Sequence, residues 1–436
     1  MFTNFHKKTV VMPDGQQIVV ETGKLARQAD GAVTVRLGNT MLLATIVATK
    51  DPRPGIDFLP LTVDYQEKFA ANGKIPGGFL KRERGLSEHE ILICRLLDRA
   101  LRPMFPSDYH ADIQIMVSLI SVDANVLPDA LAGFAAAAAI AVSDIPFEAP
   151  VSEVRVIKHN GQLMVNPATA LLEDATINLI VAGTVDNILM VEGEMSEVSE
   201  AEMLEAIKFA HESIMVQCKA LAEFTIQVGK TEKRTYNHES HDAELEAKVA
   251  EFMYKPMYDL ASASITDKSA RKDAYKKVKE SFIAQLPEPP TSEQSAWING
   301  YAKKTEKKAM RDAVMDTKIR LDGRKLNQIR QIEAEVDYLP GAHGSALFTR
   351  GETQSLTTVT LGTKLDEQII DLTMFDGTHK FMLHYNFPGF STGEVKPNRA
   401  PARREVGHGN LAYRALKKVL PKGDANPYTI DRKSVV

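Results

Sequence analysis

Alternating apolar and polar positions predict strands along the first fifty residues. Residues 8–20 hold two β-rich stretches around a Pro-Asp-Gly sequence, which is typical of a hairpin turn. Residues 32–49 predict two further strands that turn at a Gly-Asn pair. Residues 51–85 are rich in glycine, proline and charged side chains, and are predicted to be irregular. Loops of this length inside a compact domain are usually functional or disordered.

Two helices are predicted next. Ser87 and Glu90 have the spacing of a capping box, which starts a helix at about 87–101 with its apolar residues on one side. An alanine-rich helix begins near Pro128, a residue suited to a first helical turn. Its apolar run, 131–142, is too short to span a bilayer, and we expect it to be buried between other elements.

The second half of the chain changes character twice. Strands are predicted over 151–195, and residues 197–282 are then rich in Glu, Ala, Lys and Met at helical spacing. This stretch is predicted to be a separate helical region. A proline-rich break precedes one more helix at about 292–318, and the strand pattern resumes from Ile319.

The chain contains an internal repeat. The segment from Gly344 aligns without gaps with the segment from Gly31, so that glycines and threonines recur at the same positions. Two triplets recur further on, 81–83 as 403–405 and 99–101 as 414–416. Chance similarity between hairpins explains the Gly and Thr matches but not the charged triplets in the same order. We therefore interpret the chain as two copies of one α/β unit with a helical insert.

Composition narrows the class of protein. The 436 residues suggest two to four domains, and 44% hydrophobic with 25% charged residues is ordinary for a globular chain. A net charge of −4 means that any surface for a polyanion is local. Two distant cysteines make no disulfide framework and fit a reducing cytosol. The start has no apolar signal core, and no Walker loop, zinc spacing or nucleophile elbow is present.

A basic, glycine-rich loop in the first copy is one candidate site. It spans 73–85 and includes the aromatic Phe79. Its cations are Lys74, Lys81, Arg82 and Arg84. Cations beside an aromatic ring suit a single-stranded backbone with a stacked base. A solvated surface loop is the alternative, and the composition leaves both open.

Three arginines follow on the predicted helix behind this loop. Arg95, Arg99 and Arg102 stand at i, i+4 and i+7 and therefore share one face. Guanidinium groups in such a row suit phosphate or carboxylate binding. Ion pairs at a subunit interface explain the row equally well.

The second copy has a basic cluster of its own. Arg399, Arg403, Arg404 and His408 lie close together in sequence, with Glu405 as the only acid among them. The arginines could hold RNA phosphates, and His408 a phosphate oxygen or a 2′-hydroxyl; a structural histidine is the alternative. A basic site present in both copies favours a polymeric anion over a small metabolite.

Several segments resemble the bacterial polynucleotide phosphorylase family. They are IPGGFLKRERGLSEHEILICRLLDRALRPMFP at 75–106, DGTHKFMLHYNFPGFSTGEV at 376–395 and RREVGHGNLAYRAL at 403–416. The resemblance covers residues 1–430. It implies an α+β fold of two ribonuclease-PH-like (ribosomal protein S5 domain 2-like) units, the second truncated, with an all-helical domain between them. The expected domains are the first core at 1–150, its C-terminal subdomain at 151–235, the helical domain at 236–318 and the second core at 319–436.

The resemblance implies an activity: processive 3′-to-5′ phosphorolysis of single-stranded RNA, which releases nucleoside diphosphates in messenger RNA degradation. Inorganic phosphate is the co-substrate. Holding two anions together requires cations, backbone donors and usually a divalent metal, here Mg²⁺. A homotrimeric ring in the cytoplasm is implied, with other RNA-degradation proteins as possible partners and no membrane.

Site residues follow from the same resemblance. The RNA-gripping loop of the family's central channel matches Phe79, Lys81 and Arg82. The basic part of the phosphorolytic site matches Arg403, Arg404 and His408. We expect Arg95, Arg99 and Arg399 to contact RNA as well.

The chain also departs from the family pattern. Residues 79–82 read Phe-Leu-Lys-Arg where two aromatics and two arginines are common, and 84–85 read Arg-Gly in place of Gly-Arg. The metal-binding aspartates and a Ser-rich phosphate loop are expected beyond the last residue, so no metal ligand is assigned within the chain. We therefore expect the chain alone to be inactive and its second core to fold poorly, with 428–430 at an exposed strand edge.

Two other functions fit parts of this pattern. A non-catalytic RNA-binding ring subunit or scaffold would need the basic loops but no catalytic residues. A nucleotidyltransferase acting on transfer RNA ends would need one core, and the helical insert and second core argue against it.

Overall fold

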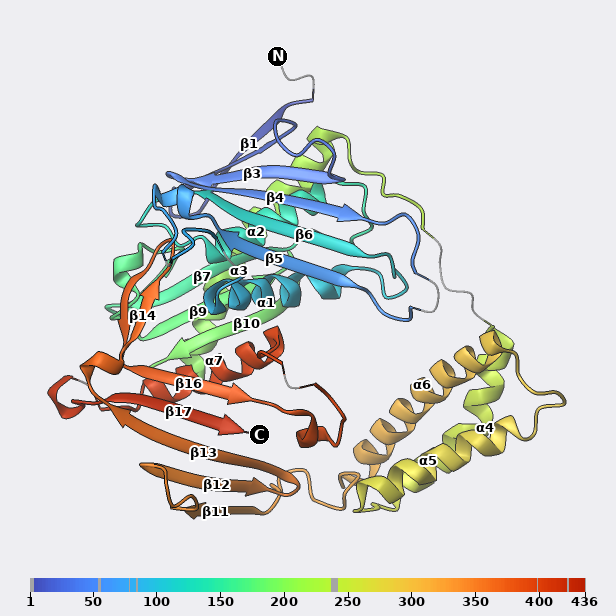
Figure 1. The fold of residues 1–436 in the computed structure, drawn as a ribbon. Coiled ribbons are helices and arrows are strands. Elements are labelled where there is room, and N and C mark those ends of the chain that lie inside the picture. Colours follow the sequence, from blue (N-terminus) through green and yellow to red (C-terminus); the bar gives the residue numbers. More distant parts are fainter. Residues whose placement is uncertain are drawn as a thin grey trace. The chain divides into compact units, whose positions relative to one another are not determined.

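The computed structural model describes residues 4–53, 56–77, 79–83, 85–236, 242–397, 399–421 and 423–435. They form two compact units. The first consists of Met1–His238, Ala334–Phe348 and Thr353–Val436, and the second of Glu239–Glu333 and Thr349–Glu352. The first unit holds the two repeated cores, and the second holds the helices that separate them in sequence (Figure 1).

A six-stranded sheet forms the first core, in the order β1-β2-β3-β4-β6-β5. Its strands are β1 His6–Val11, β2 Gln17–Thr22, β3 Gly31–Leu37, β4 Thr40–Ala48, β5 Leu61–Glu67 and β6 Ile113–Ser121. Strands β5 and β6 are parallel, and the other neighbours are antiparallel. Both predicted hairpins are confirmed, because β1 pairs with β2 and β3 with β4.

Strand β5 corrects the sequence analysis, which predicted an irregular segment over 51–85. Val63, Tyr65 and Glu67 alternate on the buried side of β5, as the period of a strand requires. The polar residues of LTVDYQE hide this alternation, because Glu67 is a carboxylate that is only 5% exposed. Hydrophobicity alone therefore misses the strand.

Two helices pack against this sheet. Helix α1, Glu88–Leu101, begins with the predicted capping box, in which Ser87 Oγ accepts from the Glu90 amide and the Glu90 carboxylate accepts from the Ser87 amide at 2.6 Å. Helix α2, Asp129–Ala141, is buried on nearly all sides, as predicted. Its small alanine side chains allow it to contact β3, β4 and β7 together.

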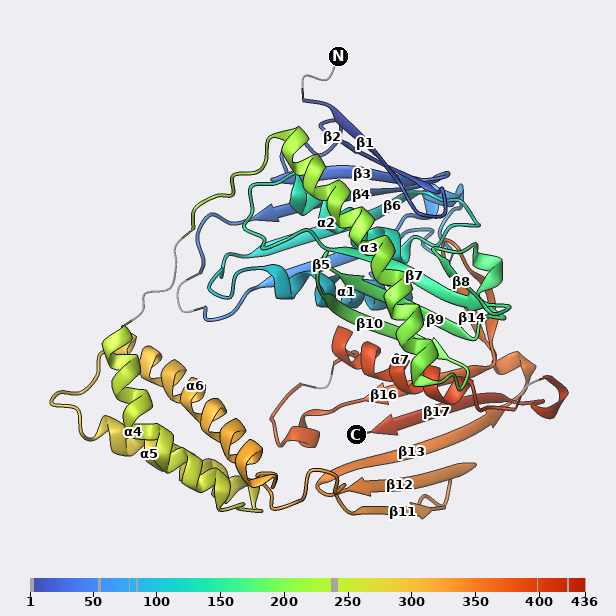
Figure 2. The ribbon, with the colours of Figure 1, turned by 180° about the vertical axis from the view of Figure 1, so that it is seen from behind.

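A second, four-stranded sheet completes the first core, in the order β10-β9-β7-β8. Its strands are β7 Ser152–His159, β8 Gln162–Val165, β9 Ile177–Gly183 and β10 Ile188–Met195. Helix α3, Glu200–Val228, contacts β7 and β9 (Figure 2). Its buried residues, among them Ile214 and Phe224, belong to the hydrophobic core of these sheets. The prediction of one separate helical region over 197–282 is therefore wrong for α3, because its apolar side completes the first core.

The second core repeats this plan with a five-stranded sheet in the order β11-β12-β13-β17-β16. Its strands are β11 Ile332–Val336, β12 Gly344–Arg350, β13 Thr353–Gly362, β16 Phe381–Asn386 and β17 Thr429–Val435. Helix α7, Arg403–Lys417, packs against β16. A separate hairpin consists of β14, Gln368–Asp371, and β15, Asp376–His379.

Strand β17 overturns the expected exposed edge at 428–430. Thr429 begins β17, and this strand lies between β13, to which it is antiparallel, and β16, to which it is parallel. Thr429 is only 3% exposed. The backbone groups of β17 thus have partners on both sides, and the strand is an interior one.

The repeat is confirmed for the strands but shifts at the helices. Gly38 and Gly351 occupy equivalent turns with φ of 59° and 60°. Glu90 and Glu405 each stand at the third position of their helix, and Arg99 and Arg414 follow each of them at the same spacing. The triplet 403–405 therefore corresponds to 88–90. The predicted match with 81–83 is wrong, because those residues precede α1.

The second unit is built on three helices: α4 Ala243–Ser262, α5 Lys268–Ile283 and α6 Ser292–Thr317. Helix α4 packs along both α5 and α6 around a core that includes Met253, Phe282 and Ile298. The predicted helix at 292–318 is confirmed, and Thr291 with Gln294 caps its start. No helix in the described ranges is long and apolar enough to cross a membrane.

The close packing of α2 against β3 can be tested at Gly31. A Cβ at this position would overlap the Ala139 carbonyl oxygen, which belongs to backbone and cannot rotate away. We expect Gly31→Ala to destabilise the first unit by about 1–3 kcal/mol, as overpacking does. Chemical denaturation measures this.

The control is Gly300→Ala within α6, where an added Cβ meets nothing. This change is expected to be neutral or stabilising by about 1 kcal/mol, since alanine favours a helix. Equal losses of stability in the two variants would contradict the packing described for α2.

Candidate functional site

The basic loop before α1 exposes its tip and fixes its base. Phe79 is 96% exposed, and Lys81 has a φ of 46° in the left-handed region. At the base, the Glu83 carboxylate accepts from Lys68 Nζ at 3.0 Å and from the Phe69 amide at 3.1 Å. The predicted aromatic and cation therefore face solvent together. Arg84 lies outside the described residues.

A cavity of about 300 Å³ lies beneath this loop. Arg82 and Glu83 line it from the loop, and Asp371 and Thr373 line it from the β14–β15 hairpin of the second core. The hairpin tip is tied down, because Asn72 Nδ2 donates to the Thr373 carbonyl at 2.7 Å and Lys74 pairs with Asp376 at 2.6 Å. A segment of the second core thus helps to shape the floor beneath the loop at 79–83. Lys74 is therefore engaged in its ion pair with Asp376.

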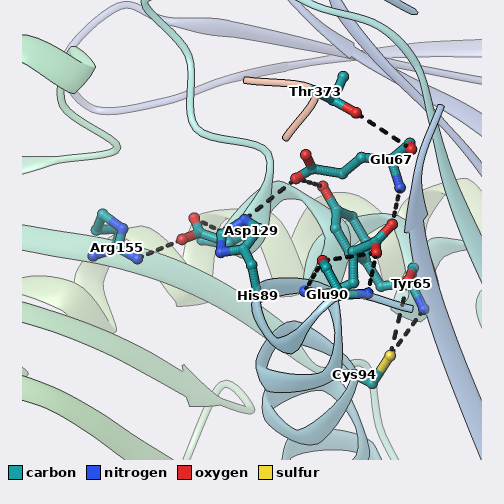
Figure 3. A network of polar contacts seen from close by, with 10 residues as sticks. Tyr65, Glu67, His89, Glu90, Cys94, Asp129, Arg155 and Thr373 are labelled. Carbon is teal, nitrogen blue, oxygen red and sulfur yellow. Dashed lines mark hydrogen bonds and ion pairs between the residues drawn. The ribbon is translucent and has the colours of Figure 1, made fainter. Parts of the chain in front are cut away.

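Glu67 is the centre of a buried polar network beside this cavity (Figure 3). Its carboxylate accepts from the Tyr65 hydroxyl at 3.0 Å and lies 3.3 Å from His89 Nε2. Its amide donates to Glu90 at 2.7 Å, and its carbonyl accepts from the Thr373 hydroxyl at 3.4 Å. The network therefore joins β5, the first turns of α1 and the hairpin of the second core.

The charges in this network shift the pKa values of His89 and Tyr65. Burial lowers the pKa of His89, but the hydrogen bond and charge of Glu67 outweigh it and the net pKa is raised. Burial, followed by the charge of Glu67, raises the pKa of Tyr65 well above its ordinary value. Tyr65 therefore remains a hydrogen-bond donor to the Glu67 carboxylate.

The predicted row of arginines on α1 divides into three separate roles. Arg102 donates to Asp98 and to the Leu59 carbonyl at 3.0 Å, so that it fixes the start of β5. Arg99 pairs with Glu192 of β10. Arg95 instead lies against Gly407 of α7, so closely that a Cβ at this glycine would overlap its guanidinium. The Arg99 pair lies within the chain, so it is not the subunit-interface ion pair offered as one alternative, and RNA binding by Arg95 and Arg99 stays a prediction.

The basic cluster of α7 also divides. Arg403 turns toward the first core, where it donates to the Val63 carbonyl at 2.7 Å and pairs with Asp64. Arg404 is exposed and makes no hydrogen bond or ion pair with the residues described. Arg399 is exposed too. The structure therefore gives Arg403 a carboxylate partner and leaves Arg404 available to an anion.

His408 lies beside the available arginine. Its ring contacts Tyr385 edge-on, with 5.5 Å between ring centroids. Burial, then the charges of Arg404 and Arg95, lowers the pKa of His408. A neutral imidazole next to two guanidinium groups can donate to or accept from a phosphate or a ribose hydroxyl. Arg95, Arg404 and His408 are thus the predicted residues that the structure brings together, across two cores.

The sequence analysis missed the carboxylates that position these cations. Asp64 lies on β5 and Glu192 on β10, and both are far in sequence from the arginines they hold. Glu67, also on β5, pairs instead with His89. In the sequence, the one signal for such a carboxylate is an acidic residue at a strand position that should be buried. Among the described residues, no group of three or more His, Cys, Asp and Glu side chains is placed to hold a metal ion.

Three protein-family descriptions match segments of this chain. The description "3' exoribonuclease family, domain 1" matches residues 14–146 and 328–436, and "domain 2" of the same family matches 149–213. "Polyribonucleotide nucleotidyltransferase, RNA binding domain" matches 244–325. The chain belongs to the 3′ exoribonuclease family. Its order of core, helical domain and second core is that of the polyribonucleotide nucleotidyltransferases.

Individual polyribonucleotide nucleotidyltransferases are similar to nearly the whole of this chain. The polyribonucleotide nucleotidyltransferases of Cytophaga hutchinsonii and Bacteroides fragilis are 61% and 56% identical over 97% of this chain, and that of Amoebophilus asiaticus is 54% identical over 99%. The chain spans 59% to 60% of the length of these relatives. A solved structure of rice Rrp46 is similar at 12% identity over 52% of this chain and 94% of its own, with a TM-score of 0.37.

The grouping of Arg95 with His408 can be tested by titration. Arg95 lowers the pKa of His408, so Arg95→Ala should raise that pKa. The measurement is the pH titration of the His408 ring protons by NMR. Arg36→Ala, which removes an exposed cation from β3, should leave the pKa unchanged. A His408 pKa that does not rise in Arg95→Ala would mean that α1 and α7 do not meet as described.

Proposed function

We propose that this chain takes part in 3′-to-5′ phosphorolysis of single-stranded RNA. The observation that carries the proposal is the loop at 79–83, in which an exposed aromatic ring and a cation stand on a base fixed by Glu83. Aromatic stacking with a backbone-tracking cation is the usual means of holding a single strand without reading its sequence. The domain matched at 244–325, described as RNA binding, is in keeping with an RNA substrate.

The reacting groups are assigned to the second core. Arg404 and His408, with Arg95 behind them, form a cationic surface that suits the phosphodiester at the strand's end or the incoming inorganic phosphate. Arg404 neutralises an oxyanion, and His408 contributes a hydrogen bond to a phosphate oxygen or a 2′-hydroxyl. We assign Arg403 a positioning role, because its pair with Asp64 fixes the first turn of α7 against β5. Arg99 also positions α1, through Glu192.

A divalent metal, magnesium in the sequence-based expectation, would reduce the repulsion between the two phosphates. The Glu67 carboxylate is engaged by the Tyr65 hydroxyl and His89, and no group of three or more His, Cys, Asp and Glu side chains among the described residues is placed to hold a metal. No step is therefore assigned to a metal. The homotrimeric ring, further RNA-degradation partners and a cytoplasmic location stay predictions.

The loop assignment predicts a specific loss of RNA binding. Changing Lys81 and Arg82 to alanine should weaken binding of an oligo(A) strand and flatten its salt dependence, by roughly 0.7 in the log–log slope for each lost phosphate contact. Fluorescence anisotropy of a labelled strand over a salt series measures both quantities. The matched control removes Arg36 and Lys50, two exposed cations outside the loop. The assignment fails if the two double variants keep the same affinity and slope.

The products distinguish phosphorolysis from hydrolysis. Phosphorolysis of poly(A) consumes phosphate and releases ADP, whereas hydrolysis releases AMP and needs no phosphate. Phosphate-independent release of AMP would contradict the proposal, whatever the result of the binding experiment. The sequence-based prediction that the chain of 436 residues is itself inactive stays a prediction, which the same assay tests.

A further inference from the structure

A basic concavity lies in the other unit, among residues that the proposed function does not use. It has a volume of about 270 Å³. Four arginines line it: Arg320, Arg324, Arg330 and Arg350. The remaining lining residues are Leu326, Asn327, Gln328 and Ile329, and none of them is acidic.

Two glycine turns bring these arginines together. The first turn has Gly323 at a φ of 84°, and the amides of Gly323 and Arg320 donate to the carbonyls of Arg320 and Arg324, both at 2.8 Å. The second has Gly351 at a φ of 60°, with its amide donating to the Gln331 carbonyl at 3.0 Å. The left-handed conformation of both glycines suits a residue without a side chain. Local backbone hydrogen bonds thus hold in place the two segments that carry these arginines.

The four guanidinium groups are not equally engaged. Arg324 pairs with Asp322 at 2.9 Å and also donates to the Gln328 carbonyl at 2.9 Å. Arg320 donates to the Leu326 carbonyl. Arg330 and Arg350 make no hydrogen bond or ion pair with any residue in the described part of the chain. Arg320 and Arg324 are therefore engaged within the wall of the concavity. Arg330 and Arg350 line it with guanidinium donors that are unpaired among the described residues.

The charge of this concavity favours an anion with more than one negative charge. Asp322 offsets one of the four arginines, which leaves three positive charges around a small volume. Like charges held close together repel unless an anion lies between them. The planar guanidinium fork matches two oxygens of a phosphoryl group, whereas an ammonium acts as a point charge.

We propose that this arginine concavity binds a phosphoryl group. The group can come from the backbone of an RNA strand or from a small phosphorylated molecule, and the chemistry of recognition is the same. The site is separate from the loop at 79–83 and from Arg404, and it does not depend on phosphorolysis.

The test removes the two free cations and leaves the wall intact. Arg330→Ala with Arg350→Ala is compared with Lys307→Ala and Lys325→Ala, which remove two exposed lysines of the same unit that do not line the concavity. Two probes are used without divalent metal or inorganic phosphate: inorganic pyrophosphate by calorimetry and a labelled oligo(A) strand by anisotropy. Circular dichroism confirms that each variant is folded.

The arginine variant should weaken at least one probe by about tenfold or more beyond the lysine control, the size of one charge-assisted hydrogen bond. Loss of oligo(A) binding alone identifies the strand backbone as the source of the phosphoryl group. Loss of pyrophosphate binding, with or without the strand, identifies a terminal or free phosphoryl group. A variant that matches the lysine control for both probes overturns the proposal.

Two further variants complete the design. Arg330→Lys with Arg350→Lys keeps the charge but not the planar fork, and should recover only part of the lost affinity. Lys81→Ala with Arg82→Ala should leave pyrophosphate binding unchanged, because the loop lies in the other unit. This second variant separates failure of the arginine site from failure of the proposed RNA loop.

Discussion

The Glu192 carboxylate is shared by equivalent helices of the two copies. Glu192 of β10, half-buried, accepts from Arg99 of α1 and from Arg414 of α7, the latter at 3.1 Å. These arginines are equivalent in the two copies. A carboxylate with two charge-assisted hydrogen bonds in a partly dry position favours one packing of α1 against α7. Because each helix is packed against its own sheet, fixing the helix pair fixes the two cores of the first unit relative to each other.

The candidate site depends on this arrangement. Arg95 comes from α1 and reaches Arg404 and His408 on α7 only because Gly407 leaves room for its guanidinium. Arg403 holds the start of α7 to β5 through Asp64. The hairpin tip at Thr373 links the second core to Glu67 and Asn72, beside the base of the loop at 79–83. Duplication has thus produced a site that neither copy contains alone, with cations from both copies and carboxylates that direct them.

Local signals in the sequence predicted much of this structure. The capping box at Ser87, the hairpin turns and the buried alanine helix each follow from residues within a few positions of one another. Strand β5 was missed, because its buried carboxylate hides the apolar alternation. The helical composition over 197–282 also failed to separate α3 from the later helices, although the family resemblance placed 151–235 with the first core. The division of the arginines had no local signal either. Which cation is free and which is paired depends on carboxylates on other strands.

If Glu192 couples α1 to α7, removing its charge should loosen α7. The measurement is hydrogen exchange of the α7 amides in the unchanged protein and in Glu192→Gln. The glutamine keeps the shape but loses the charge, so α7 should lose protection by about 1–3 kcal/mol, the contribution of hydrogen bonds to a charged group. Helices α4 to α6 of the other unit should be unaffected. Equal protection of α7 in the two proteins would mean that Glu192 does not couple the helices.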